Sequence, residues 1–310
     1  MAWIGVALLG YFFNAVTAVL DKYLLSGPIK APAVYAFFVA LFSLFALGFI
    51  PFGFQFVGWE ITGVLLASGV IFLYGLVAFY VAVQAWNISR IAPLVGIVVS
   101  LVAFGALLLP GFSEAEFTVI HIVALCFLIV GGGLLAFDLP LKPHEYVPWQ
   151  VLVAGVAMGV SLLLLKYGYE QADFVSGLVW SRLGIFLAGL SLLLIPTFRR
   201  QIFSSMRGGM TPGTQNIATG VIFVVNKTLA GIGSFLIVYA TFLGPVSFVQ
   251  ALSGMQYLFL LFLTLPLCHF FPLVYCERLL FWDWAQRIGA IFLIGLGLWL
   301  SAMSGVTVLV

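Results

Sequence analysis

Charged residues are the scarcest component of this sequence. Lys, Arg, Asp and Glu together make up 7% of its 310 residues, while 64% are hydrophobic. A soluble globular domain carries about 25% charged residues. No water-soluble fold covers its surface with so few charges, so the composition predicts a polytopic membrane protein. The formal net charge of +2 is too small to indicate a nucleic-acid partner.

Cysteine frameworks, metal-ligand spacings and enzyme motifs are also missing. The three cysteines, Cys126, Cys268 and Cys276, are scattered and form neither a disulfide framework nor a metal-binding pattern. The three histidines have no H-E-x-x-H spacing, and there is no G-x-S-x-G motif. The glycine runs follow no predicted strand, which excludes dinucleotide and P-loop fingerprints. We therefore expect no enzyme activity, no cofactor and no bound metal.

Long apolar runs fill the chain instead. Each reaches roughly the 20 residues that cross a bilayer, and the short breaks between them carry Gly, Pro and most of the charge. The first run lacks a basic n-region and a cleavage site, so we interpret it as a retained span. The sequence predicts an all-α membrane protein with ten transmembrane helices. They cover residues 2–20, 32–50, 60–85, 91–109, 118–137, 147–168, 175–196, 216–241, 246–267 and 286–306.

The two halves of the chain resemble each other. Five short matches recur in the same order, which predicts five-helix repeats over residues 1–140 and 141–310. Because five is odd, the second repeat enters the membrane from the opposite side, an inverted arrangement typical of secondary transporters. The matches pair Lys22-Tyr23 with Lys166-Tyr167, Tyr35 and Pro51 with Trp180 and Pro196, Gly69–Phe72 with Gly220–Phe223, the LLLP ending at Pro110 with the LTLP ending at Pro266, and Phe127-Leu128-Ile129 with Phe292-Leu293-Ile294.

The orientation follows from the basic residues of the loops. Loops after odd-numbered spans hold nearly all the Lys and Arg, including Arg90, Arg199 and Arg200, whereas loops after even-numbered spans hold only Lys166. The positive-inside rule therefore predicts that the odd loops face the cytoplasm and that both termini lie outside.

Two basic residues lie deep in the predicted spans. A lysine at bilayer depth costs roughly 2.5–3.5 kcal/mol on insertion scales, so Lys227 indicates a wet or protein-lined site. Arg182 lies about two turns into its span, while every acid, Asp21 included, lies at a span end or in a loop. This pattern favours an anionic or zwitterionic substrate and disfavours a proton-coupled exporter of cations. The alternatives are that Arg182 snorkels to the interface and that Lys227 is bonded within the packing, for example to Asn226.

A polar stripe accompanies Lys227 in the stretch 224–262, which we expect to form one wall of the site. Gln250, Ser253 and Tyr257 share one helical face, and Gln256 lies about 100° from Tyr257. The alternative is hydrogen bonding between helices. The predicted substrate-binding residues are Lys227, Asn226, Gln250, Ser253, Gln256, Tyr257, Trp180, Arg182, Asn14 and Tyr35.

Ten spans in two halves, together with local motifs, resemble the drug/metabolite transporter superfamily and its EamA-type members. The motifs are the small-residue starts at 87–94 and 244–254, and Cys276-Glu277-Arg278-Leu279 followed by Arg287-Ile288-Gly289-Ala290. The resemblance implies a secondary carrier with a central cavity for amino acids, other metabolites, nucleotide sugars or drugs. It gives Glu277 a structural role. Many members have both termini in the cytoplasm, opposite to the orientation predicted from charge.

We therefore expect a multi-pass carrier in the inner membrane of a bacterium or archaeon. It would move a small polar metabolite, such as an amino acid or organic phosphate, by alternating access. The partners are this small molecule and membrane lipids, and we expect a monomer, with a dimer as the alternative. The alternative functions are a lipid flippase or scramblase, an exporter of amphipathic drugs, and a non-transporting receptor or scaffold.

Overall fold

In the computed structural model, every regular element of the described residues is a helix. The described residues are 2–26, 31–85, 88–106, 119–136, 149–208, 214–244, 248–249, 252–270 and 281–303. The helices are α1 (Ala2–Ser26), α2 (Pro32–Ser43), the 3-10 helix η1 (Leu44–Phe52), α3 (Trp59–Ala85), α4 (Ile88–Ala106), α5 (Val119–Ala136), α6 (Trp149–Tyr169), α7 (Phe174–Leu192), α8 (Pro196–Gly208), α9 (Thr214–Leu243), α11 (Ser253–Phe270) and α13 (Phe281–Met303).

Six stretches of helix in the described residues are long and apolar enough to cross a bilayer. They are Ala2–Asp21, Pro32–Phe52, Trp59–Gln84, Trp149–Tyr169, Phe174–Leu192 and Gly220–Leu243. Each overlaps a run predicted from the sequence, and together they indicate a multi-pass integral membrane protein. The other four predicted runs overlap α4, α5, α11 and α13, and the count of ten spans remains a prediction.

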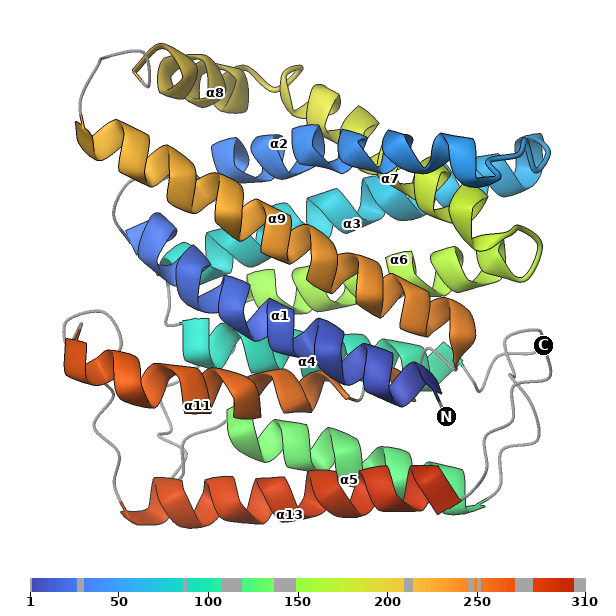
Figure 1. The fold of residues 1–310 in the computed structure, drawn as a ribbon, viewed down its shortest axis with the longest axis vertical. Coiled ribbons are helices and arrows are strands. Elements are labelled where there is room, and N and C mark those ends of the chain that lie inside the picture. The colour runs from blue at the N-terminus through green and yellow to red at the C-terminus, as the bar shows by residue number, and fades with distance from the viewer. Residues whose placement is uncertain are drawn as a thin grey trace.

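The helices pack side by side as a bundle (Figure 1). Helix α1 packs against α9 and α11, α3 packs against α6 and α7, and α5 packs against α13. Helix α4 contacts α5 and α6, and α2 lies against α7 and α3. Segments from opposite halves of the chain are therefore direct neighbours throughout the bundle.

Glycines bring two of these helix pairs into backbone contact. A Cβ atom added at Gly69 of α3 would lie 2.0 Å from the carbonyl oxygen of Ser181, and one at Gly184 of α7 would lie 2.2 Å from that of Leu66. At the α1–α9 crossing, a Cβ atom on Gly10 would lie 3.1 Å from the carbonyl oxygen of Gly233. Small residues at such crossings allow close helix packing in lipid.

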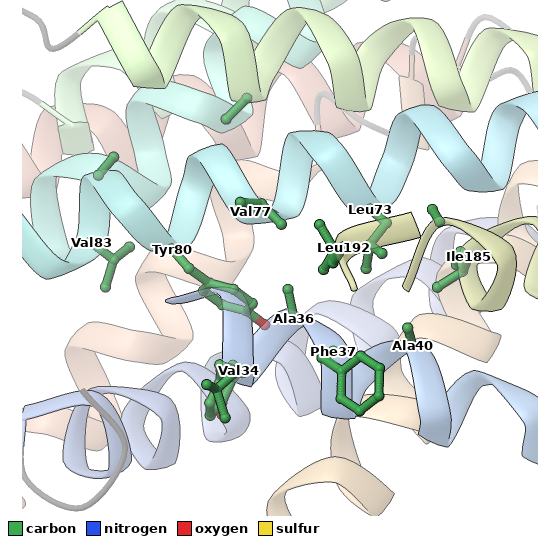
Figure 2. Close-up of a cluster of buried hydrophobic side chains, with 14 of the residues drawn as sticks. Val34, Ala36, Phe37, Ala40, Leu73, Val77, Tyr80, Val83, Ile185 and Leu192 are labelled. Carbon is green, nitrogen blue, oxygen red and sulfur yellow. The ribbon is translucent and has the colours of Figure 1, made fainter. Parts of the chain in front are cut away.

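A buried apolar cluster connects α2, α3 and α7. Figure 2 shows Leu73 of α3, with Leu192 and Ile185 of α7 on either side of it, facing Phe37 and Ala40 of α2. These side chains are buried, so α2 and α7 form one packed unit with α3. This unit positions one wall of the candidate site.

The segment after α7 differs from the sequence-based expectation. The sequence predicts a charged break over 198–213, whereas α8 is a helix from Pro196 to Gly208. Ile202 is buried as part of the apolar cluster, whereas Arg199 and Arg200 are exposed. The segment is too short and too polar to cross a bilayer, but the helical period gives it one apolar side.

Candidate functional site

An ion pair is buried between α1 and α9. The Nζ atom of Lys227 lies 3.3 Å from Oδ1 of Asp21, and the two side chains are 4% and 16% exposed. The sequence places Asp21 among the acids at span ends. It is the last residue of the apolar stretch Ala2–Asp21, but α1 continues to Ser26, and the close crossing of α1 and α9 brings this carboxylate to the ammonium group.

Two further donors converge on the same carboxylate oxygen. The hydroxyl of Tyr35 and the Nδ2 group of Asn226 both donate to Oδ1 of Asp21. Asn226 Nδ2 also donates to the Tyr35 hydroxyl at 3.1 Å. Hydrogen bonds to an ionised acceptor are about twice as strong as neutral ones. We call Asp21, Tyr35, Asn226 and Lys227 the α1–α9 centre, in which three donors converge on Oδ1 of Asp21.

Aromatic rings enclose the ammonium group of this centre. Lys227 Nζ lies 3.9 Å from the ring centroid of Tyr35 and 5.5 Å from that of Phe223, within the range of cation–π attraction. The ring of Tyr80 on α3 points toward α2 (Figure 2). It meets the ring of Tyr35 edge to face, with the centroids 4.8 Å apart. Lys227 is therefore compensated both by a carboxylate and by ring faces.

A second basic group lies at the middle of α7. Arg182 is the ninth of the 19 residues of Phe174–Leu192 and is half-buried. Its Nη2 group donates to the hydroxyl of Ser234 on α9 at 2.7 Å. Within the described part of the chain, no carboxylate lies within ion-pair distance of this guanidinium. Arg182 is thus a cation at mid-helix without a described counter-charge.

The hydroxyl of Tyr169 is another unused donor near this arginine. It is buried without a hydrogen-bond partner among the described residues, and it interacts electrostatically with Arg182. The ring of Tyr169 lies against α7 at Gly177, where a Cβ atom would be 2.2 Å from Cε1 of the tyrosine. We call Arg182, Ser234 and Tyr169 the α7–α9 centre. All three groups can donate to an anion.

Helix α9 carries part of both centres on one face. Ser234 follows Lys227 by seven residues, which is two helical turns and about 10 Å along the axis. Lys227 and the serine that binds Arg182 therefore lie on one line along α9. The two basic groups differ in their counter-charges. Lys227 has its own carboxylate, whereas among the described residues Arg182 has the neutral hydroxyl of Ser234 as its partner.

The other predicted site residues are more dispersed. The ring of Trp180 packs against Phe54, with the centroids 5.4 Å apart, and its Nε1 atom is buried without a partner among the described residues. Asn14 lies at the α1–α9 crossing, with its Oδ1 atom 2.7 Å from the position of a Cβ on Gly233.

The predicted stripe on α11 is only partly visible. Ser253 and Gln256 are half-buried on α11, a helix that packs on α1, α4, α5 and α13. Helix α1 contacts both α9 and α11, so it intervenes between this stripe and Lys227. Gln250 and the side chain of Tyr257 lie outside the described residues.

Three residues of the two centres are not among the predicted site residues. Asp21, Tyr169 and Ser234 contribute a carboxylate and two hydroxyls to the two centres. Tyrosines at the end of an apolar run are typical of interfacial belts, and serines are common in transmembrane helices. A helical-face comparison of Ser234 with Lys227 is the one signal in the sequence that could have found any of them.

The comparisons with known proteins identify a similar fold and give no information on function. No protein-family model and no curated protein sequence matches this chain. Sixteen chains of solved structures match it in fold. One, described as "Crystal structure of protein", has a TM-score of 0.63 and 12% sequence identity, and the match covers 97% of each chain. The helical arrangement therefore extends over the whole length of a chain solved elsewhere.

Proposed function

We propose that this protein is a secondary carrier of a small polar metabolite with an anionic group, and that Arg182 binds that group. The observation that carries the proposal is the half-buried guanidinium at mid-helix, bonded to Ser234 and without a carboxylate among the described residues. A charge within a membrane-spanning helix is costly and typically marks a substrate or ion pathway. A bound anion would supply the missing counter-charge.

In this proposal, the roles of Lys227 and Arg182 differ from those predicted from the sequence. The sequence predicts that Lys227 neutralises the substrate, with Asn226 orienting it. Asp21 already compensates Lys227, and Asn226 and Tyr35 hold the same carboxylate. We therefore assign anion binding to the α7–α9 centre and a charge-compensating role to the α1–α9 centre.

We also propose that the carrier has ten spans in two inverted five-helix repeats and works by alternating access. The pattern of helix contacts supports this. The proposed repeat pairs α1 with α6, α3 with α9 and α4 with α11. Under this pairing the α3–α6 contact corresponds to the α1–α9 contact, and the α4–α6 contact corresponds to the α1–α11 contact. All four contacts are present. The α5–α13 and α2–α7 contacts are also present, and each maps onto itself when α5 exchanges with α13 and α2 with α7. Membership of the EamA-type transporters rests on the sequence motifs alone.

Ligand-induced thermal stabilisation of the purified protein tests this function. The panel holds amino acids, organic phosphates, nucleotide sugars and organic cations. We expect anionic members to stabilise the wild type and to lose this effect in Arg182→Gln. Arg199→Gln removes the same charge from the exposed face of α8 and serves as the control that keeps the response.

Two results would contradict the proposal. Stabilisation by organic cations alone would overturn the assignment of an anionic substrate. Scrambling of a labelled phospholipid in proteoliposomes, with the same dependence on Arg182, would favour the lipid flippase or scramblase instead. Uptake of a stabilising anion into proteoliposomes by the wild type but not by Arg182→Gln would complete the assignment.

A further inference from the structure

Five charged residues lie within the six candidate spans, and two of them lie at helix ends. Glu60 is the second residue of α3 and is exposed. Lys166 lies in the last turn of α6, where its Nζ atom is 3.5 Å from the carbonyl oxygens of Thr241 and Gly244. Those carbonyls are at the end of α9, where the helix dipole favours a cation. Both charges are therefore stabilised locally.

Among the described residues of the six candidate spans, the three remaining charges do not cancel. Asp21 contributes one negative charge, while Lys227 and Arg182 contribute one positive charge each, which leaves a sum of +1. Asp21 and Lys227 form the buried pair, so the surplus lies at Arg182. A charge held partly away from water without a counter-charge is unfavourable. A ligand with one negative charge brings the sum to zero, whereas a dianion or a zwitterion leaves one charge uncompensated.

We infer that the buried charges select a substrate with a single net negative charge, and that Asp21 determines this preference. The inference rests on the proposed function and names the substrate class of the same carrier. Asp21 is a specificity-determining residue that acts through Lys227. Its carboxylate accepts bonds from Lys227, Tyr35 and Asn226, so it removes Lys227 from the set of cations that a ligand must neutralise.

Substitutions at the pair should shift the preferred ligand charge in opposite directions. Asp21→Asn keeps the shape of the side chain and raises the interior sum to +2, which favours a dianion. Lys227→Gln lowers the sum to zero, which favours a zwitterion or a neutral molecule. The double variant Asp21→Asn/Lys227→Gln returns the sum to +1 and should regain the preference for a monoanion.

The experiment measures binding of three small probes of similar size to the full-length protein in detergent. Lactate carries one negative charge, malonate two, and alanine is a zwitterion. We expect the wild type to bind lactate most tightly. In Asp21→Asn the ratio of the lactate to the malonate dissociation constant should shift about tenfold towards malonate, and in the double variant it should return to the wild-type value. Arg199→Gln, an exposed substitution on α8, should leave the order unchanged.

Other outcomes of this binding experiment would overturn either the inference or the proposed function. An unchanged order of affinities in Asp21→Asn, with binding retained, would overturn the inference and leave the proposed function intact. If Asp21→Asn does not fold, the double variant decides, because a preference for malonate or alanine there would overturn the inference. If lactate binding to the wild type does not depend on Arg182, the inference is overturned, whereas the proposed function is contradicted only if the anions of the wider panel also fail to stabilise the protein through Arg182.

Discussion

The proposed repeat relates the α3–α7 contact to the α2–α9 contact, and different chemical groups form the two contacts. In the α3–α7 contact, Gly69 and Gly184 bring the backbones together, and an added Cβ atom would lie within 2.2 Å of a carbonyl oxygen at either glycine. In the α2–α9 contact, side chains reach across instead. The ring of Phe223 meets those of Phe38 and Phe42, with centroids 5.7 and 5.9 Å apart.

Gly220 shows how the α2–α9 contact differs from the α3–α7 contact. It matches Gly69 in the repeated sequence Gly-Val-Ile-Phe, yet a Cβ atom at Gly220 would meet nothing within 4 Å. Matching residues therefore do not make matching contacts in this conformation. At Gly69 and Gly184 the α3–α7 contact leaves no room for a side chain, whereas the rings of the α2–α9 contact can change rotamer. On the proposed mechanism, α2 and α9 approach each other when α3 and α7 separate.

The largest expected effect concerns the ion pair beside the α2–α9 contact. Asp21→Asn leaves the Lys227 ammonium buried without its carboxylate, and we expect a loss of about 3–5 kcal/mol in the free energy of unfolding. Asp21→Asn/Lys227→Gln removes both charges and should lose less than the single variant. Unfolding of the protein in bicelles measures both, and a double variant that loses as much stability as Asp21→Asn, or more, would contradict the idea that the unpaired ammonium group is what destabilises the single variant.

Glycine substitutions test the comparison itself. Gly69→Ala places a methyl group against the backbone of α7, so we expect a loss of about 1–3 kcal/mol in the free energy of unfolding. Gly220→Ala is the matched control, because its methyl group enters open space and should change stability by less than about 0.5 kcal/mol. The same bicelle assay applies. Equal effects of the two substitutions would contradict the described difference between the contacts.

Tyrosine hydroxyls offer a finer test of the two contacts. Tyr35→Phe keeps the ring beside Lys227 but removes the hydroxyl bond to Asp21, and we expect a loss of about 1.5 kcal/mol, typical of a hydrogen bond to a charged group. Tyr74→Phe removes the exposed bond between Tyr74 of α3 and Ser191 of α7 and should have a smaller effect. A larger loss for Tyr74→Phe would place the important polar contact on the α3–α7 side.

The sequence predicts the helices well because the bilayer demands a long apolar run for each span. The runs 60–85 and 175–196 coincide closely with α3 and α7. A search for long apolar runs does not detect α8, because an amphipathic helix needs only one apolar face. Pro196 at its first position, followed by Phe198 and Ile202 four residues apart, is the pattern that could have predicted it.

The partners within the candidate site could not be predicted in the same way. The sequence identifies Arg182 and Lys227 as deep cations, because charge is so rare in the apolar runs. It does not show that Lys227 meets Asp21, 206 residues away, or that Arg182 meets Ser234. Those pairings depend on which helices are neighbours, and any polar residue facing the bundle would suit the sequence equally well.

Cysteine labelling at Ser234 tests the central claim most directly, namely that Arg182 and Ser234 line a site within the membrane that a water-soluble anion can reach. In a background in which Cys126, Cys268 and Cys276 are replaced, Ser234→Cys should react with a membrane-impermeant thiol reagent, and a stabilising anion should slow the reaction. Ile232 lies two residues away on a different side of α9 and is exposed. We expect Ile232→Cys to face lipid and stay unlabelled. Failure of Ser234→Cys to react from either side of the membrane would contradict the account.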